Sequence, residues 1–402
     1  MERNNNILIH CNYNPLTSYG GIERVVMRLI GILDEWGCRI SCISADTNSE
    51  RRTVGSCEYI FRKTLWKMAG APVTSLGNIA LCKAAAGKRV IFFQEPYPTL
   101  WPAIVVIRAV LRIPVVVIVH ADPEASGLVH LLYAKLRYVL FSGCVCVTTS
   151  RSIAERIDMG PKLKPRIIPL CTREELPDAE RLEVNGLPDD FVLYVGRLAA
   201  YKGIDVLIDA AMATPTISYV VAGSGPLAER VTHAIREQGC SNITFVNRSI
   251  SEGEKDYLIH RSRFVVFPST TRNEAFGLVQ LEAMRARRAL VNTQLETGVN
   301  DVAPHMVCAL TVPPRDAVSL RTAIERLWQD RALAEQLGVA GRERYATLFS
   351  EETFRGSWMT LLDELSESGV LPTRKRQTEA VDPKRELGNV SLSKDRKEQN
   401  AC

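Results

Sequence analysis

The segment 269–284, STTRNEAFGLVQLEAM, is the most informative stretch of this chain. It follows an apolar, β-branched run at 264–267 that ends at Pro268, which is typical of a buried strand. The pattern predicts a loop that carries Glu274, and then a helix that begins near Gly277 and contains Glu282. A helix N-terminus has unpaired N–H groups and partial positive charge, so it suits a diphosphate, while nearby carboxylates accept hydrogen bonds from sugar or ribose hydroxyls. The alternative interpretation is two solvated glutamates, one on a loop and one on an amphipathic helix.

The rest of the chain alternates short apolar strands with amphipathic helices. Continuous β-branched runs such as 115–119 indicate strands covered on both faces, and therefore a parallel sheet. Strands are predicted at 6–11, 39–44, 89–93, 114–120, 143–149, 191–195, 218–222, 243–246, 264–267, 290–292 and 309–312, and helices at 21–35, 204–212, 226–238, 317–329 and 351–366. This order favours an α/β protein with a doubly wound sheet in each half.

Composition limits the class of protein. With 402 residues, 46% hydrophobic and 24% charged, the chain can bury the cores of two domains. Its eleven cysteines lack metal-ligand spacing, and Cys144 and Cys146 alternate along an apolar strand as core residues would. The odd number of cysteines and the missing secretory leader favour a reducing cytosol. No run reaches the roughly 18 apolar residues that a spanning helix requires, so we expect no membrane crossing.

Charge is distributed unevenly along the chain. Residues 1–170 carry 21 Lys and Arg against 12 Asp and Glu, whereas residues 171–350 carry 20 against 23. The basic half contains two stretches that mix cations with apolar side chains, at 62–68 and 128–141. Such amphipathic stretches suit an anionic lipid surface, although a helix packed on its own domain with solvated cations has the same pattern. Nucleic acid is not expected as a partner, because no binding motif accompanies the charge.

Candidate ligand-binding residues follow several of the predicted strands. In open α/β sheets, ligands bind beyond the carboxyl ends of strands. Gly20 and Gly21 precede a helix and let a phosphate approach the backbone closely, although Gly-Gly turns are also common without a ligand. Arg197 and Lys202 provide two cations that suit a leaving diphosphate, with surface cations as the alternative.

Together these motifs resemble the family 4 glycosyltransferases, which are retaining enzymes of the GT-B fold. The resemblance rests on Gly20-Gly21-Ile22-Glu23, on Tyr194-Val195-Gly196-Arg197-Leu198 with Lys202-Gly203, on Val221-Ala222-Gly223-Ser224-Gly225-Pro226, and on the E-x7-E spacing of Glu274 and Glu282. It implies two Rossmann-like domains with a cleft between them. The expected divisions are an acceptor-binding domain at 1–172, a linker at 173–190, a nucleotide-sugar-binding domain at 191–349, a helix at 350–370 that crosses back to the first domain, and a disordered tail at 371–402.

The resemblance also implies roles for individual residues. Arg197 and Lys202 would neutralise the leaving group, Glu274 would hold the donor sugar, Glu282 would hold the ribose, and His120 would touch the donor sugar. Asp122 is placed in the site beside His120. The alternative for His120 is a capping or core residue, since a lone histidine at a strand end most often has one of these roles. The remaining donor-binding residues are Gly20, Gly21, Gly223, Gly225, Arg248, Phe276, Gly277 and Leu278.

The expected reaction is transfer of a hexosyl group with retention and without a metal ion, because no Asp-x-Asp motif occurs and two cations are already present. No cofactor is expected beyond the nucleotide diphosphate sugar, with GDP-mannose as the first candidate. The expected acceptor is a lipid-linked or other oligosaccharide, at the inner face of the cytoplasmic membrane. The alternatives are a nucleotide-sugar epimerase or hydrolase of the same fold, and a non-catalytic binding module.

Two segments depart from the family pattern. Arg287-Arg288-Ala289 stands where the family usually has a glycine before the next strand, and the loop at 294–299 is altered. Because that loop lines the donor-sugar side in the family, the sequence leaves the identity of the sugar open.

Overall fold

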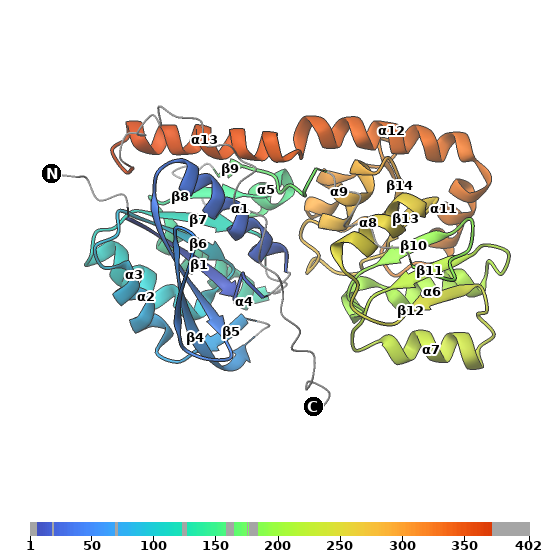
Figure 1. Ribbon diagram of the computed structural model, residues 1–402, viewed down its shortest axis with the longest axis horizontal. Coiled ribbons are helices and arrows are strands. Elements are labelled where there is room, and N and C mark those ends of the chain that lie inside the picture. The colour runs from blue at the N-terminus through green and yellow to red at the C-terminus, as the bar shows by residue number, and fades with distance from the viewer. Residues whose placement is uncertain are drawn as a thin grey trace.

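Two sheets form two lobes in the computed structural model, which describes residues 6–17, 20–68, 71–122, 127–157, 165–174, 176 and 184–371. Each sheet is covered by helices on both faces (Figure 1). The α/β fold expected from the sequence is confirmed.

The first lobe is built on a sheet of order β3-β4-β2-β1-β6-β7-β8-β9, with β5 paired to β4. Its strands pair in parallel except for β3 and β5, which run antiparallel to β4. The strands are β1 (Asn6–Tyr13), β2 (Arg39–Asp46), β3 (Arg51–Val54), β4 (Cys57–Met68), β5 (Ala71–Thr74), β6 (Val90–Glu95), β7 (Val115–Val119), β8 (Val145–Thr148) and β9 (Arg166–Ile167). The helices are α1 (Gly21–Glu35), α2 (Gly77–Ala85), α3 (Trp101–Ala109), α4 (Gly127–Phe141) and α5 (Arg151–Arg156).

The second lobe has a six-stranded parallel sheet of order β12-β11-β10-β13-β14-β15. Its strands are β10 (Val192–Val195), β11 (Tyr219–Ala222), β12 (Ile243–Val246), β13 (Phe264–Phe267), β14 (Ala289–Thr293) and β15 (Ala309–Val312). Its helices are α6 (Ile204–Met212), α7 (Ala228–Glu237), α8 (Glu252–Arg261), α9 (Leu278–Arg285), α10 (Gly298–Val302), α11 (Ala317–Gln329) and α12 (Arg331–Leu348).

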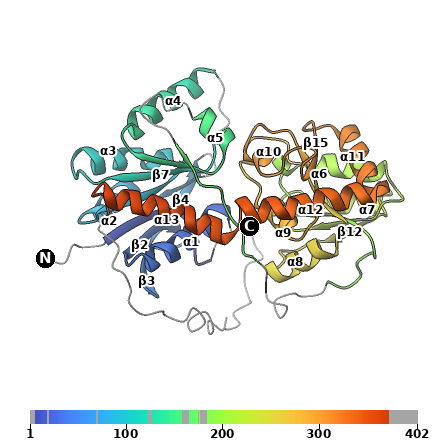
Figure 2. The same ribbon diagram turned by 90° about the horizontal axis from the view of Figure 1, so that it is seen from above.

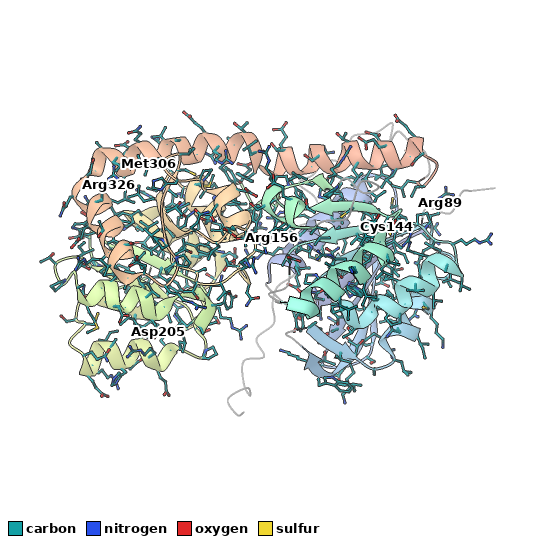
Figure 3. The ribbon with its side chains drawn as sticks, turned by 180° about the vertical axis from the view of Figure 1, so that it is seen from behind. Arg89, Cys144, Arg156, Asp205, Met306 and Arg326 are labelled. Atoms are coloured by element: carbon teal, nitrogen blue, oxygen red, sulfur yellow. The ribbon has the colours of Figure 1, made fainter. Side chains whose placement is uncertain are left out.

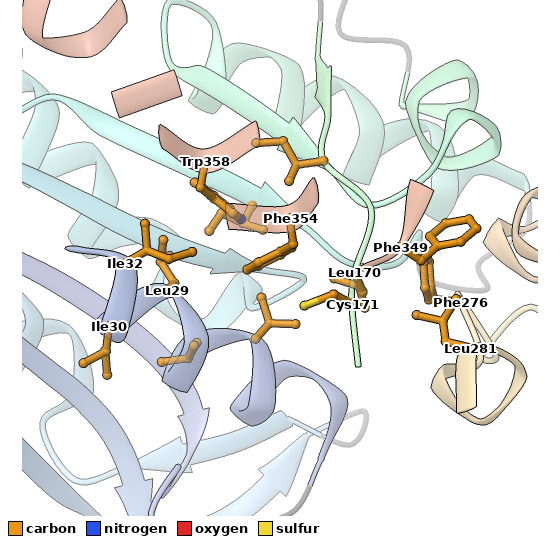
Figure 4. Packing of buried hydrophobic residues seen from close by; sticks show 14 of the residues in the cluster. Leu29, Ile30, Ile32, Leu170, Cys171, Phe276, Leu281, Phe349, Phe354 and Trp358 are labelled. Carbon is orange, nitrogen blue, oxygen red and sulfur yellow. The ribbon is translucent and has the colours of Figure 1, made fainter. Parts of the chain in front are cut away.

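A long C-terminal helical segment runs along both lobes. After α12, helix α13 (Glu351–Glu367) lies across the first lobe (Figures 1 and 2). Phe354 and Trp358 of α13 belong to the same buried cluster as Leu29 and Ile32 of α1 (Figure 4). In the same cluster, the Phe276 and Phe349 rings lie 6.2 Å apart. The hydrophobic core is therefore continuous from the second lobe through α13 to the first.

One detail differs from the sequence expectations. The basic stretch that begins at Arg62 lies in strand β4, where alternate side chains point to opposite faces, so it forms no amphipathic helix. The second stretch does lie on a helix, α4. No helix among the described residues is long and apolar enough to span a membrane. The tail from residue 372 onward lies outside the described residues.

Candidate functional site

The two lobes meet where the N-terminus of α1 faces the N-terminus of α9. A Cβ atom on Gly21 would lie 3.5 Å from Cδ1 of Leu278. Gly20 is the N-cap of α1, and Gly277 caps α9 with a φ of +78°, a conformation that suits glycine. The structure therefore brings two N-termini, each with unpaired N–H groups, to one place. Such a pair suits a ligand with two negatively charged groups.

Lys202 and Glu274 form an ion pair beside these helix ends. The Lys202 ammonium donates to Oε2 of Glu274, and it also lies 5.2 Å from the ring centre of Tyr201 and 5.4 Å from that of Phe267. Burial is the largest single effect and lowers the pKa of Lys202, but the charge of Glu274, the hydrogen bond to it and the nearby Tyr201 together outweigh burial, so the pKa is raised. Lys202 therefore stays charged at neutral pH.

Arg197 lies in the loop after β10 with an exposed side chain. Its carbonyl accepts a hydrogen bond from the Tyr194 hydroxyl at 3.0 Å, which fixes the loop backbone. Within the described part of the chain, no carboxylate forms an ion pair with the Arg197 guanidinium. The backbone of Arg197 is fixed, and its exposed guanidinium is available to bind an anion.

The glycines of the 223–225 loop are explained by packing of two loops. A Cβ on Gly223 would lie 1.9 Å from the carbonyl oxygen of Gly196, and one on Gly225 would lie 2.5 Å from that of Leu198. Both glycines also have φ near +150°. The two glycines allow this loop to pack against the loop that carries Arg197. They therefore lie next to the candidate site, but packing alone explains why they are glycines.

Glu282 is buried on α9 and is held by two cations. Its Oε1 accepts from the Lys255 ammonium at 2.6 Å and from the Arg24 guanidinium at 3.4 Å. Arg24 also donates to Glu252 at 2.5 Å, and Lys255 lies 3.0 Å from the same carboxylate. The sequence interpretation singled out Glu282 but missed Arg24, Lys255 and Glu252. One signal was present for Arg24, since it follows the Gly20-Gly21 pair by one helical turn.

Arg248, which was expected to bind the donor, follows β12. Its guanidinium donates to both oxygens of Glu254, at 2.5 and 3.0 Å. The hydrogen bond from Arg248 is the main cause that lowers the pKa of Glu254 to about 2. Glu254 also completes the capping box of α8 with Ser251. Arg248 thus supports the start of α8, and only its exposed face is left for a ligand.

His120 lies at the end of β7 in the first lobe. It is buried, and its Nε2 lies 2.6 Å from Oε1 of Gln94. Burial lowers the pKa of His120 to about 4, so the imidazole is neutral at physiological pH. The Asp122 carboxylate pairs with Arg137 at 3.0 Å and with Arg156 at 3.7 Å, and not with His120.

The low pKa of His120 predicts a pH dependence of stability. Below the histidine pKa of about 6.5 in the unfolded chain, the unfolded state binds a proton and the native imidazole does not. The free energy of unfolding therefore falls by up to about 1.4 kcal/mol for each unit by which the pH is lowered. Burial lowers the pKa of His10 to about 3, which adds a similar slope. Burial raises the pKa of Glu23 and of Glu95, which acts in the opposite sense. We therefore expect His120→Gln to flatten the wild-type slope between pH 7 and 5 in denaturant titrations, and an unchanged slope would contradict a neutral buried His120.

A second set of contacts joins the lobes at α5 and α10. The backbone N–H of Ser152 donates to Asp301 at 2.7 Å, and Arg156 lies 3.9 Å from the carboxylate of Glu296. Figure 3 shows Arg156 at the junction of the two lobes. Glu296 belongs to the altered loop at 294–299 and has a φ of +52°, and Arg287 in the other altered segment has a φ of +57°. Both departures from the family sequence thus fall on backbone that ordinarily favours glycine.

The chain is similar to known proteins. Residues 180–344 match the family model described as "Glycosyl transferases group 1". The chain is 28% identical to the O-antigen chain mannosyltransferase C of Escherichia coli, over 90% of this chain and 98% of that protein. It is also 28% identical to the D-rhamnosyltransferase WbpZ of Pseudomonas aeruginosa, over 82% of this chain and 88% of that protein.

Solved structures show the same fold. Sucrose-phosphate synthase from Thermosynechococcus elongatus superposes with a TM-score of 0.73 at 20% identity, covering 90% of this chain and 99% of that one. HepE from Anabaena, solved in complex with UDP-glucose, gives a TM-score of 0.67 at 16% identity, covering 90% of this chain and 100% of that one.

Proposed function

We propose that the chain, whose residues 180–344 match the family model of the group 1 glycosyl transferases, transfers a hexosyl group from a nucleotide diphosphate sugar to a lipid-linked or other oligosaccharide acceptor. Two observations carry this proposal: Lys202 pairs with Glu274, three residues before the N-cap of α9, and the N-terminus of α9 lies against that of α1 from the other lobe. GDP-mannose is the first candidate donor. The similarity to an O-antigen chain mannosyltransferase over nearly the whole length of both chains supports a mannosyl donor and a bacterial surface polysaccharide as product.

We propose transfer with retention and without a metal ion. The bond between the anomeric carbon and the diphosphate oxygen breaks as the acceptor hydroxyl attacks from the same face, and the hydroxyl proton passes to the departing oxygen. Lys202, Arg197 and the N–H groups at the starts of α1 and α9 would stabilise the negative charge that develops on the diphosphate. Glu274 would hold the donor sugar and His120 would contact it as a neutral group.

Two other functions make different predictions. A nucleotide-sugar epimerase or hydrolase would act on the donor with water in place of an acceptor. A non-catalytic binding module would need no cation such as Lys202 buried against a carboxylate. The ion pair therefore favours an enzyme.

The test is release of nucleoside diphosphate from a panel of nucleotide sugars, including GDP-mannose and UDP-glucose, with and without lipid-linked oligosaccharide acceptors. The proposal requires release from one donor that accelerates with an acceptor, and a product with the donor's anomeric configuration in NMR. Rapid release that no acceptor accelerates indicates a hydrolase or epimerase. Binding without release from any donor indicates a binding module. Loss of activity with a chelator, restored by added metal, would overturn the metal-independent mechanism alone.

We extend the proposal to a membrane surface, which a lipid-linked acceptor requires. Helices α3 and α4 of the first lobe are joined where Arg108 donates to the carbonyls of Leu140 and Ser142. Their outer side, here named the α3–α4 face, exposes the apolar residues Val105, Val106, Val110, Leu111, Leu132, Leu136 and Val139. Exposed Arg112 and Lys135 accompany them, and the sequence contains no Asp or Glu at 98–121 or 125–150. Apolar side chains with cations and without carboxylates suit an anionic bilayer, at the inner face of the cytoplasmic membrane.

Two negative charges introduced on the α3–α4 face are expected to weaken membrane binding strongly. Val110 is 70% exposed and Leu136 is 51% exposed, so Val110→Glu with Leu136→Glu leaves the core intact and repels anionic lipid. In flotation with vesicles of phosphatidylglycerol and phosphatidylcholine, we expect at least a tenfold lower bound fraction than for the wild type. The matched control is Val318→Glu on α11, where the side chain is 65% exposed on the second lobe. Equal loss in the control, or no loss in the double variant, would reject the face.

A further inference from the structure

Arg24 connects the first lobe to the carboxylate that the proposed function assigns to the ribose. It lies on α1, one turn beyond Gly20 and Gly21, and reaches across the junction to the second lobe. There it contacts Glu252 at 2.5 Å and Glu282 at 3.4 Å. The other partner of Glu282 among the described residues, Lys255, belongs to the same lobe as Glu282. Arg24 is therefore the residue through which the first lobe contacts this carboxylate.

The geometry at Glu282 leaves one side of the carboxylate available. Both cations, Lys255 and Arg24, bind the same oxygen, Oε1. No hydrogen bond to Oε2 occurs within the described part of the chain. A buried carboxylate with one oxygen fixed by cations is kept ionised and held in one rotamer, and its second oxygen can accept hydrogen bonds from hydroxyl groups.

We propose that Arg24, together with Lys255, is a positioning residue that orients Glu282 toward the ribose of the donor and links recognition of the nucleotide to contact between the lobes. This inference rests on the proposed function, since it requires a ribose at Glu282. Glu252 supports the arrangement, because it accepts from both cations and so holds them beside Glu282. Arg24 acts through Glu282 and touches no reacting atom.

The test compares a ribonucleotide with its deoxy analogues. We would first identify the nucleoside diphosphate that the wild type binds most tightly, and then measure the dissociation constants of that ligand and of its 2′-deoxy and 3′-deoxy forms. If Glu282 reads the ribose hydroxyls, the wild type should bind at least one deoxy form about tenfold or more weakly, as expected for a lost hydrogen bond to a charged group. In Arg24→Gln we expect the ribonucleotide to bind about tenfold more weakly and the discrimination against the deoxy form to shrink to less than about threefold. Arg24→Lys should restore part of the discrimination.

Arg28 provides a matched control on the same helix. It lies one turn after Arg24, is similarly half-buried, and pairs with Glu351 of α13 at 3.0 Å instead of with the second lobe's α9. Arg28→Gln removes the same charge and one ion pair, so it should leave the discrimination unchanged. If Arg24 had a purely structural role, Arg24→Gln would weaken the binding of all the nucleotides by the same factor.

The possible results separate this inference from the function on which it rests. If the wild type binds no nucleoside diphosphate, the proposed function fails. If the wild type binds and discriminates but Arg24→Gln discriminates equally well, the function stands and the role of Arg24 is rejected. A higher KM for the donor with an unchanged kcat in Arg24→Gln would support positioning, whereas a fall in kcat alone would overturn it.

Discussion

Replacing Lys202 by methionine is expected to lower kcat of sugar transfer by about two to three orders of magnitude, the usual effect of losing one preorganised charge from a transition state. The ammonium is buried against Glu274, and its raised pKa keeps it charged. In the proposed mechanism, negative charge would grow beside Lys202 as the diphosphate departs, so little reorganisation would be needed. Initial rates of nucleoside diphosphate release at saturating donor measure the effect.

The ion pair requires a control for folding, because Lys202→Met leaves the carboxylate of Glu274 buried without its main partner. The double variant Lys202→Met with Glu274→Gln removes both charges and should unfold near the wild-type temperature. If Lys202→Met itself unfolds near the wild-type temperature and still transfers slowly, the loss of kcat comes from the site and not from the fold. A folded Lys202→Met with wild-type kcat would remove Lys202 from the catalytic residues.

Much of the fold was predictable because its signals are local. The predicted helix 21–35 coincides with α1, since its apolar residues recur at helical spacing and become buried. The run at 115–119 coincides with β7, which is buried throughout. The strands β3, β4, β5 and β9 were not predicted. β3 is exposed throughout, β5 and β9 span only four and two residues, and the basic stretch within β4 was interpreted as an amphipathic surface segment.

Residues of the candidate site could be predicted only where they belong to a sequence motif that is typical of ligand binding. Glu274 and Lys202 lie 72 positions apart in sequence, yet both follow strands of one parallel sheet, whose carboxyl ends share one edge. The bond between them was not foreseen, because sequence spacing does not give the direction of a side chain. Arg24 was missed for a related reason, since its partners lie on the other lobe and depend on how the lobes meet.

The largest effect on stability is expected from Arg285→Ala, which should lower the free energy of unfolding by about 3–5 kcal/mol, as for other buried ion pairs that lose one partner. Arg285 is 4% exposed and its partner Asp256 is 1% exposed. The other arm of the guanidinium donates at 2.8 Å to the carbonyl of Arg173, where the chain leaves the first lobe. Denaturant titration at pH 7 measures the change. The exposed pair of Arg331 and Asp190 is the control, and Arg331→Ala should cost less than about 1 kcal/mol.

The effect of Arg285→Ala has two sources, and a second variant separates them. One is the buried charge of Asp256, which loses its arginine partner, and the other is the lost hydrogen bond to the chain at Arg173. Arg285→Met with Asp256→Leu removes both charges and keeps the volume, so it should recover most of the stability if the buried charge dominates. If the double variant remains as unstable as Arg285→Ala, the hydrogen bond to Arg173 is the main contribution. Arg285 would then be important because it fastens the chain at Arg173 to α9, the helix that also carries Glu282.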